Sequence, residues 1–477
     1  MSEYMLNFHS LSLDFVDRFK SVQYKGIPLA LFYNFYYGLV ANDSKSIMLE
    51  KSFRAPLMIR IEQEHEIQKS YDAIMNPIMN TVPGKTRRDG KVLLYDYVLA
   101  AHSFVHFLEP SKIFMMNHDN VLQILAQYHI EKSEVKNELV RQAKTIFEQC
   151  TTQPFLSNGG FQQSILETYF PTILNLLIQV DNLFDQVPIS CVMVGTTVDA
   201  VSRILCVVAA QRGIPSINTQ HGVISVEEQF MPVYATKTAV LGHYEKEWYL
   251  RRGVPEHRLE ITGHPRHDVI FAGAPSSKEQ FQKRFGLNPH KKTVLITSQE
   301  DVEIVNLTYF IENLIVNCAP DILIKPHPHE YAFQSIHIYN HLLRLPGVKL
   351  VNDFFYHLLP YVDLVVVIGH STTGLEAMLA NKPVLCFKKE KPVPTFINDF
   401  YDAMGSFTNS NPNKLAEMAI PLLNGNSDIH HQYRIKRDDF VKWRYPKQNA
   451  TKELFDLLYK LTGTSFINPS NRPPFYR

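Results

Sequence analysis

The sequence has few cysteines, and they follow no pattern typical of a disulfide or zinc framework. Its 477 residues include five scattered cysteines, an odd number without a CxxC pair, and no HExxH motif. A disulfide scaffold or a zinc site is therefore not expected, and this cysteine content fits a reducing cytosol.

A charge excess of one sign and a long apolar run are missing too. The 48 Lys and Arg residues nearly balance the 47 Asp and Glu residues, so we expect no nucleic-acid partner held by bulk charge. No secretion signal and no apolar run of about 18 residues occur, so we expect no membrane span. The apolar residues 27–40 favour a helix packed on the protein's own core, with an interfacial helix as the alternative. We expect a cytoplasmic protein and leave peripheral contact with the inner face of the membrane open.

The phosphate-binding loops of two large nucleotide-binding classes are also absent. Neither GxxxxGK[ST] nor GxGxxG occurs, which weakens the NTPase and dehydrogenase interpretations.

Short apolar runs alternate with amphipathic stretches over most of the chain after residue 88. Strands that alternate with helices predict right-handed βαβ units and parallel sheets, so the fold class is α/β. The predicted strands are residues 91–97, 112–117, 189–195, 215–219, 238–241, 258–262, 293–297, 322–325, 348–351, 364–368 and 383–387.

The loop-like sequence AGAPSS at residues 272–277 divides this pattern in two. We therefore predict two doubly wound, Rossmann-like domains in series. The predicted domains are a helical N-terminal extension (1–87), a first Rossmann-like domain (88–272), a second one (273–430), and C-terminal helices with a tail that pack back on the first domain (431–477).

Two polar motifs follow strands of the second predicted domain, where ligands of such sheets bind. KPHP ends one strand, and GHSTTGLE follows another and opens a helix, whose free N–H groups and hydroxyls could bind an anion. The alternative is structural, because Thr373 and Glu376 have the spacing of a capping box. The candidate ligand-binding residues are Lys325, His327, Pro328, His370, Ser371, Thr372, Thr373 and Glu376.

With these motifs and the following GLEAMLANKPVLCF, the chain resembles the nucleotide-binding domain of GT-B glycosyltransferases. It is similar in particular to bacterial surface- and capsule-polysaccharide transferases, including the CDP-glycerol glycerophosphotransferase and the Kdo- and sialyltransferase groups. In those groups an HP motif, here His327 and Pro328, and a Ser/Thr cluster, here residues 371–373, hold the donor's phosphates. Glu376 stands where many GT-B enzymes bind the donor, often through its ribose. The resemblance covers roughly residues 190–390 and is more specific for the fold than for the donor.

The first predicted domain carries its own candidates at strand ends. His221, in a QHG turn that recurs in the same families, could act as a general base, and Gly222 would allow a backbone to approach closely. Gly263, His264 and Arg266 lie in a GHPRHD stretch near the domain boundary; Arg266 could clamp a phosphate, although pairing with Asp268 is the interpretation we favour.

The resemblance implies a transferase that moves a group from a nucleotide-activated sugar or polyol donor to a hydroxyl on a glycan, lipid-linked or protein-linked acceptor. No two aspartates stand two positions apart, so the DxD metal clamp of the other common glycosyltransferase fold is missing, and we expect neither a metal nor a cofactor. The alternatives are an isomerase like UDP-GlcNAc 2-epimerase, on the same fold, and a binding protein that has lost catalysis. The sequence leaves the oligomeric state open.

Overall fold

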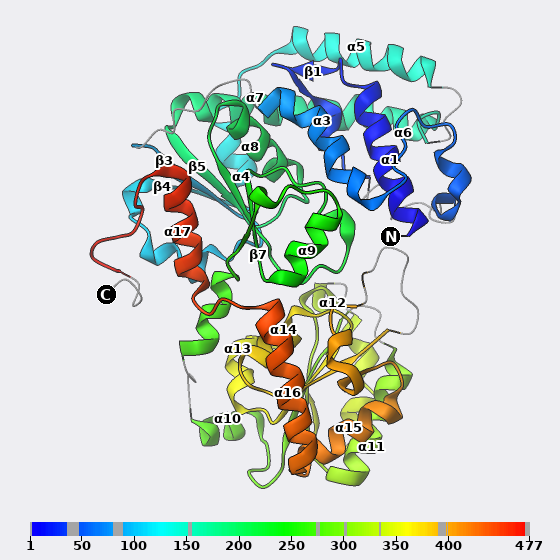
Figure 1. The fold of residues 1–477 in the computed structure, drawn as a ribbon, viewed down its shortest axis with the longest axis vertical. Helices are drawn as coiled ribbons and strands as arrows, with labels where there is room; N and C mark the ends of the chain where they lie inside the picture. Colours follow the sequence, from blue (N-terminus) through cyan, green and yellow to red (C-terminus); the bar gives the residue numbers. More distant parts are fainter. Residues whose placement is uncertain are drawn as a thin grey trace. The chain divides into compact units, whose positions relative to one another are not determined.

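The chain forms two compact units, each built around a parallel sheet (Figure 1). Unit 1 comprises Met1–His221, Val226–Pro265 and Asn449–Arg477, and unit 2 comprises Gly222–Ser225 and Arg266–Gln448. The computed structural model describes residues 2–35, 47–79, 89–150, 155–272, 277–299, 303–332, 335–389, 397 and 399–472.

The sheet of unit 1 has six parallel strands in the order β4-β3-β5-β6-β7-β8. Every residue of the central strand β5 is buried, as expected for a parallel strand covered by helices on both faces. The strands are β3 (Lys91–Asp96), β4 (Ile113–Asn117), β5 (Ile189–Val194), β6 (Ser216–Thr219), β7 (Lys237–Val240) and β8 (Leu259–Ile261).

Helices from three parts of the chain cover this sheet (Figure 1). The last helix packs on the sheet through Leu454, Phe455 and Leu458, which share one buried core with residues of β3, β5, β6 and β7. The helices of unit 1 are α1 (Glu3–Arg18), α3 (Ile67–Met79), α4 (Val121–Ala126), α5 (Ser133–Gln149), α6 (Gly159–Ser164), α7 (Phe170–Gln186), α8 (Ala200–Gln211), α9 (His243–Arg251) and α17 (Ala450–Thr462).

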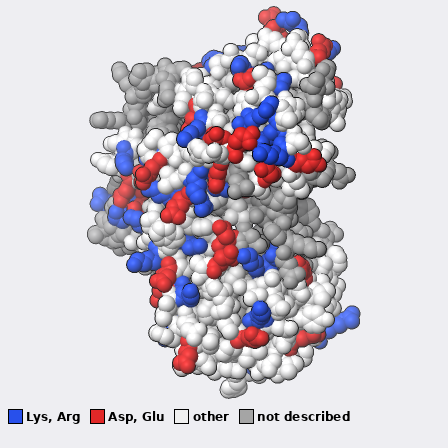
Figure 2. All heavy atoms as spheres, turned by 45° about the vertical axis from the view of Figure 1, so that its right-hand side comes forward, with Lys and Arg blue, Asp and Glu red and all other residues white. Residues whose placement is uncertain are grey.

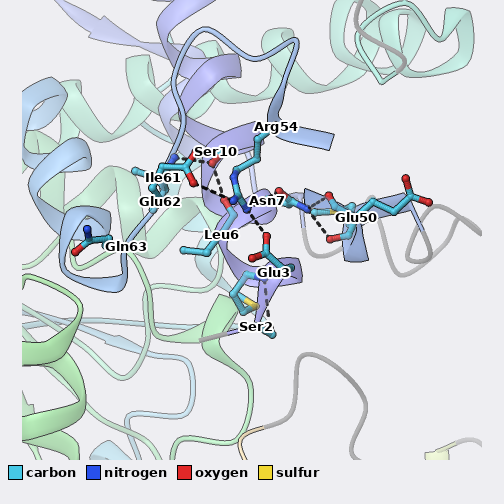
Figure 3. Close-up of polar contacts among 12 residues, drawn as sticks. Ser2, Glu3, Leu6, Asn7, Ser10, Glu50, Arg54, Ile61, Glu62 and Gln63 are labelled. Atoms are coloured by element: carbon cyan, nitrogen blue, oxygen red, sulfur yellow. Dashed lines mark hydrogen bonds and ion pairs between the residues drawn. The ribbon is translucent and has the colours of Figure 1, made fainter. Parts of the chain in front are cut away.

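Helix α1 is buried on all sides over most of its length, so its polar side chains need partners inside the protein. Asn7 donates hydrogen bonds to the carbonyl oxygens of Met48 and Glu50, both at 2.8 Å (Figure 3). The buried Arg54 in turn donates to Asn7 at 3.0 Å and to Glu3 at 2.8 Å. These bonds fix α1 within unit 1.

Unit 2 repeats the doubly wound plan with the strand order β11-β10-β9-β12-β13-β14, again all parallel. Its strands are β9 (Thr293–Thr297), β10 (Asp321–Lys325), β11 (Val348–Leu350), β12 (Leu364–Ile368), β13 (Val384–Phe387) and β14 (Thr408–Asn409). Its helices are α10 (Lys278–Phe285), α11 (Ile304–Cys318), α12 (Pro328–Ala332), α13 (Phe355–Leu358), α14 (Thr372–Leu379), α15 (Pro412–Leu423) and α16 (Ser427–Arg444).

The boundaries between the two units differ from the domain boundaries expected from the sequence. Unit 2 begins at Arg266 rather than at residue 273, and the chain returns to unit 1 at Asn449 rather than at residue 431. The reason lies in α16, whose buried Tyr433 donates to the carbonyl of Lys382 at 3.0 Å and accepts from the amide of Val384 at 2.9 Å. These bonds hold α16 on β13 of unit 2, so only α17 and the tail return.

The apolar residues 27–40 do not begin as the single helix that we expected. Ile27–Pro28 forms strand β2 of a short hairpin, and Leu29–Phe32 forms a buried 3₁₀ turn. Residues 36–40 of that stretch lie outside the described residues. Among the described residues, no helix is long and apolar enough to cross a membrane. On the face shown in Figure 2, acidic and basic side chains are intermixed rather than separated by sign.

Candidate functional site

Three neighbouring strands of unit 2 bring the two predicted motifs to one edge of the sheet. Strand β9 lies between β10 and β12, so the loops after these strands all leave from the carboxyl edge. The amide of Ser298, after β9, donates to the carbonyl of Lys325 at the end of β10, at 3.1 Å. The KPHP loop and the residues before α14 therefore leave the same edge of the sheet on either side of β9, where ligands of doubly wound sheets bind.

Helix α14 begins in a cluster of hydroxyl groups. Ser371 is its N-cap residue, and the Ser371 side chain accepts a hydrogen bond from the amide of Thr373 at 3.4 Å. The Thr373 hydroxyl lies 2.7 Å from the Ser371 hydroxyl and 2.8 Å from the hydroxyl of Thr297, the last residue of β9. The helix N-terminus therefore offers backbone N–H groups together with a continuous chain of three hydroxyls.

Thr372 contacts a segment that lies far away in the sequence. Its hydroxyl accepts a hydrogen bond from the amide of Val223 at 3.2 Å. A Cβ atom added to Gly222 would lie only 2.8 Å from the same hydroxyl, so the absence of a side chain permits this approach. Residues 222–225 belong to unit 2, and they follow directly on His221, the last residue of the preceding stretch of unit 1.

The KPHP loop is fixed by a buried carboxylate that the sequence analysis did not single out. Glu330 is 1% exposed and accepts hydrogen bonds from the His327 amide at 2.6 Å, the Ser298 hydroxyl at 2.5 Å and the Tyr339 hydroxyl at 2.6 Å. The carboxylate thus bonds to the loop after β9, the loop after β10 and the 3₁₀ turn that contains Tyr339. These bonds hold the backbone of His327 in one position. The only sequence signal is a glutamate three residues after the histidine, which is also helix-cap spacing.

The other residues of the KPHP motif and of the loop after β12 differ in burial. Burial lowers the pKa of the Lys325 ammonium, and the charge of Asp353 opposes this shift. His327 is half-buried and Pro328 is exposed, while His370 is buried between the end of β12 and the N-cap residue of α14.

Glu376 does not form the capping box that was the alternative interpretation. Ser371 rather than Thr373 is the N-cap residue, and the third helical position is Gly374. The Glu376 carboxylate instead accepts a hydrogen bond from Tyr356 at 2.7 Å and lies 3.2 Å from Nε2 of His267. Glu376 is therefore part of a buried polar cluster inside unit 2.

The charges around Glu376 decide its protonation. Burial raises the pKa of the Glu376 carboxyl, but the hydrogen bond and charge of His267, the charge of Arg266 and the Tyr356 hydroxyl outweigh it. The pKa therefore lies below its usual range. Burial and the neighbouring Glu376 charge raise the pKa of Tyr356, so Tyr356 remains a hydrogen-bond donor. Arg266 thus acts on this cluster, a role that the favoured pairing with Asp268 did not foresee.

The candidates in unit 1 also lie at strand ends. His221 follows β6 after the buried Gln220, and its ring stacks on Phe230 with 5.2 Å between centroids and an angle of 10° between planes. Stacking fixes the plane of the imidazole and leaves its two nitrogens at the ring edge. After β8, Gly263 has a φ of 71°, in the region that favours glycine, and His264 is 1% exposed.

The sequence predicted the motif residues but missed the side chains that hold them. Four such side chains contact candidate residues, but each comes from a separate segment or follows a motif without matching any pattern: His267, Tyr356, Tyr401 and Glu330. His267 is the one with a usable signal, since it directly follows Arg266 in GHPRHD.

Comparison with known proteins shows that part of this chain is similar to a described family. Residues 297–390, which include both motifs of unit 2, match the model of the family described as capsule polysaccharide biosynthesis protein. A search of curated proteins finds no match to this chain. The family match confirms the predicted resemblance to proteins of capsule and surface polysaccharide synthesis.

Solved structures show the fold. UDP-GlcNAc 2-epimerase from Neisseria meningitidis bound to UDP-GlcNAc is similar over 78% of this chain and 100% of that chain, with 16% identity and a TM-score of 0.51. Two others have lower scores. The wall teichoic acid polymerase TagF reaches 0.46 with 12% identity, over 84% of this chain and 94% of its own. A glycosyltransferase from Rickettsia africae reaches 0.47 with 11% identity, over 79% and 100%. The epimerase similarity, together with the two parallel sheets, confirms the predicted GT-B fold.

Proposed function

We propose that this protein transfers a sugar or a polyol phosphate from a nucleotide-activated donor to an acceptor hydroxyl in surface-polysaccharide synthesis. The observation that carries the proposal is the convergence of the α14 N-terminus with the KPHP loop at one sheet edge, inside the segment that matches the capsule family. The donor's phosphates would accept hydrogen bonds from the first amides of α14 and from Ser371. His327, whose loop Glu330 fixes, would donate to the same phosphates.

His221 is the proposed general base. Histidine is the side chain that ordinarily changes protonation near neutral pH, so it can take a proton from an acceptor hydroxyl near working pH. The stack on Phe230 orients the ring, and Gly222, the next residue, belongs to the segment that contacts Thr372.

The reaction would proceed by attack of the acceptor oxygen as His221 removes its proton. With a sugar nucleotide, the bond between the anomeric carbon and the phosphate oxygen breaks and the nucleotide leaves. With a CDP-linked polyol, the phosphoanhydride bond breaks and CMP leaves. In either case the charge that develops on the leaving phosphate would be stabilised by the helix N-terminus and His327.

The Glu376 cluster would bind the other part of the donor. Glu376 is ionised at neutral pH because its pKa is lowered, so it can accept hydrogen bonds from ribose hydroxyls. One of its oxygens already accepts from Tyr356 and faces His267, so the other oxygen is the one proposed for the donor.

A screen of nucleotides followed by two activity assays tests the proposal. Thermal shift over CMP-, CDP-, UDP- and GDP-linked compounds should reveal a stabilising donor, since a ligand of the native state raises the melting temperature. That donor is then incubated with and without acceptor glycans. Release of nucleotide only with an acceptor supports transfer. Conversion of UDP-GlcNAc alone would instead support the epimerase, which the fold similarity keeps as the second candidate.

A further inference from the structure

Tyr401 packs against the first turn of α14. Its ring is 2% exposed and stacks on Phe440 of α16, with 5.6 Å between centroids and an angle of 4° between planes. Phe400 packs edge-on against the same ring at 4.9 Å. The aromatic neighbours therefore hold the ring in place whether or not it carries a hydroxyl.

The Tyr401 hydroxyl is inserted into the first turn of α14. It accepts a hydrogen bond from the amide of Leu375 at 3.0 Å and donates one to the carbonyl of Ser371 at 2.6 Å. These two backbone groups are four residues apart, so an ordinary α-helical turn would join them directly. A Cβ atom added to Gly374 would come within 2.4 Å of the hydroxyl, which shows how closely Tyr401 approaches the helix.

We propose that Tyr401 is a positioning residue for the donor phosphates, an inference that rests on the proposed function of the α14 N-terminus. By bridging Ser371 and Leu375, the hydroxyl sets where the N-cap residue and the first amides of α14 stand. Both of these hydrogen bonds go to backbone groups, so the effect of the hydroxyl on binding passes through the backbone of α14.

Unit 2 contains a matched control in Tyr433. The Tyr433 hydroxyl makes the same pair of bonds, accepting from the Val384 amide at 2.9 Å and donating to the Lys382 carbonyl at 3.0 Å. Tyr433 is also 2% exposed. Its bonds lie at the amino end of β13, whereas the proposed donor site lies at the carboxyl edge of the sheet. Replacing either tyrosine by phenylalanine therefore removes the same pair of hydrogen bonds, but only the Tyr401 hydroxyl bonds to the first turn of α14.

The test compares full-length Tyr401→Phe, Tyr433→Phe and Ser371→Ala with the wild-type chain. Each is titrated calorimetrically with CDP and with UDP, and melting temperatures are recorded. Both tyrosine variants should melt at lower temperature, because each loses buried hydrogen bonds. Only Tyr401→Phe should weaken nucleotide binding, by about tenfold, while Tyr433→Phe should stay within about twofold of the wild type.

The variants distinguish a failure of the positioning role of Tyr401 from a failure of the proposed donor site. If Ser371→Ala weakens binding but Tyr401→Phe does not, or if Tyr433→Phe weakens it equally, the positioning role is refuted and the donor site stands. If wild type binds neither nucleotide nor any compound of the thermal-shift screen, or if Ser371→Ala and Tyr401→Phe both bind normally, the donor site itself is refuted. Should Tyr401→Phe fail to fold, Phe440→Leu removes the stacked ring that supports Tyr401, and unchanged nucleotide affinity in that variant overturns the inference.

Discussion

Replacing Glu376 by glutamine should destabilise unit 2 measurably, although the same change would be nearly neutral in a capping box. The carboxylate accepts a hydrogen bond from Tyr356 at 2.7 Å and faces His267 at 3.2 Å, both in a buried setting. A glutamine oxygen still accepts from Tyr356 but without the charge. Hydrogen bonds to charged groups contribute about 1.5–3 kcal/mol and neutral ones about 0.5–1.5, so we expect a loss of about 1–2 kcal/mol.

The assay can follow unit 2 alone, because the chain has two tryptophans and each unit contains one. In a Trp248→Phe background, urea unfolding monitored by Trp443 fluorescence reports on α16 of unit 2. Tyr356→Phe and the double variant complete a cycle, in which a coupling energy of about 1 kcal/mol between Tyr356 and Glu376 is expected. An unchanged unfolding midpoint for Glu376→Gln, or strictly additive effects, would refute the assigned contacts.

The pH dependence of this difference has a definite sign. Because the folded-state pKa of Glu376 is lowered, the stabilisation is present above its unfolded pKa of about 4.5 and is lost as pH falls through the lower, folded value. The gap between wild type and Glu376→Gln should therefore be largest near neutral pH and should shrink in acid. A gap that widens in acid would contradict the lowered pKa.

Other variants address the proposed chemistry and the stability of unit 1. His221→Ala should lower turnover by roughly 10²- to 10⁴-fold with little change in nucleotide affinity, and normal turnover would require another base. His327→Ala should weaken nucleotide binding by about 10- to 150-fold in calorimetry on the folded protein, and equal affinity would remove it from the site. Glu227→Gln should cost unit 1 about 1.5–3 kcal/mol in urea unfolding, because Arg252 loses a charged, buried hydrogen-bond partner while it keeps the more exposed Glu64. Burial raises the pKa of Glu227, but Arg252 and His9 outweigh it and lower this pKa to about 2. The stability difference between wild type and Glu227→Gln should therefore persist at pH 5 and shrink only as the pH falls towards 2.

The strands and their order of appearance could be predicted because buried parallel strands have a simple signature. Residues 294–296 and 364–368 are uninterrupted apolar runs, and the strands β9 and β12 occupy residues 293–297 and 364–368 in the structure. The rule that ligands bind at carboxyl ends of strands then placed the KPHP and GHSTTGLE motifs at one edge. Strand β14, of only two residues, has no such signature.

The network around the motifs could not be predicted, because its members are close only in space. Ser371 and Thr373 can both serve as helix caps, and a shift of two residues between them changes Glu376 from a capping residue to a partner of Tyr356 and His267. No local pattern distinguishes these two registers. Tyr401 meets Ser371 across 30 residues of chain, so its role depends on a tertiary contact alone.

The three-part make-up of unit 1 has a consequence for how the protein is synthesised. Its core closes only when α17 covers β3 and β5, and α17 follows the whole of unit 2 in the chain. Domains generally fold as units as they leave the ribosome. Unit 2 can therefore fold while unit 1 still exposes the apolar side of its sheet. A chain whose synthesis ends before residue 450 lacks α17, so its unit 1 stays incomplete and is a substrate for chaperones and proteases.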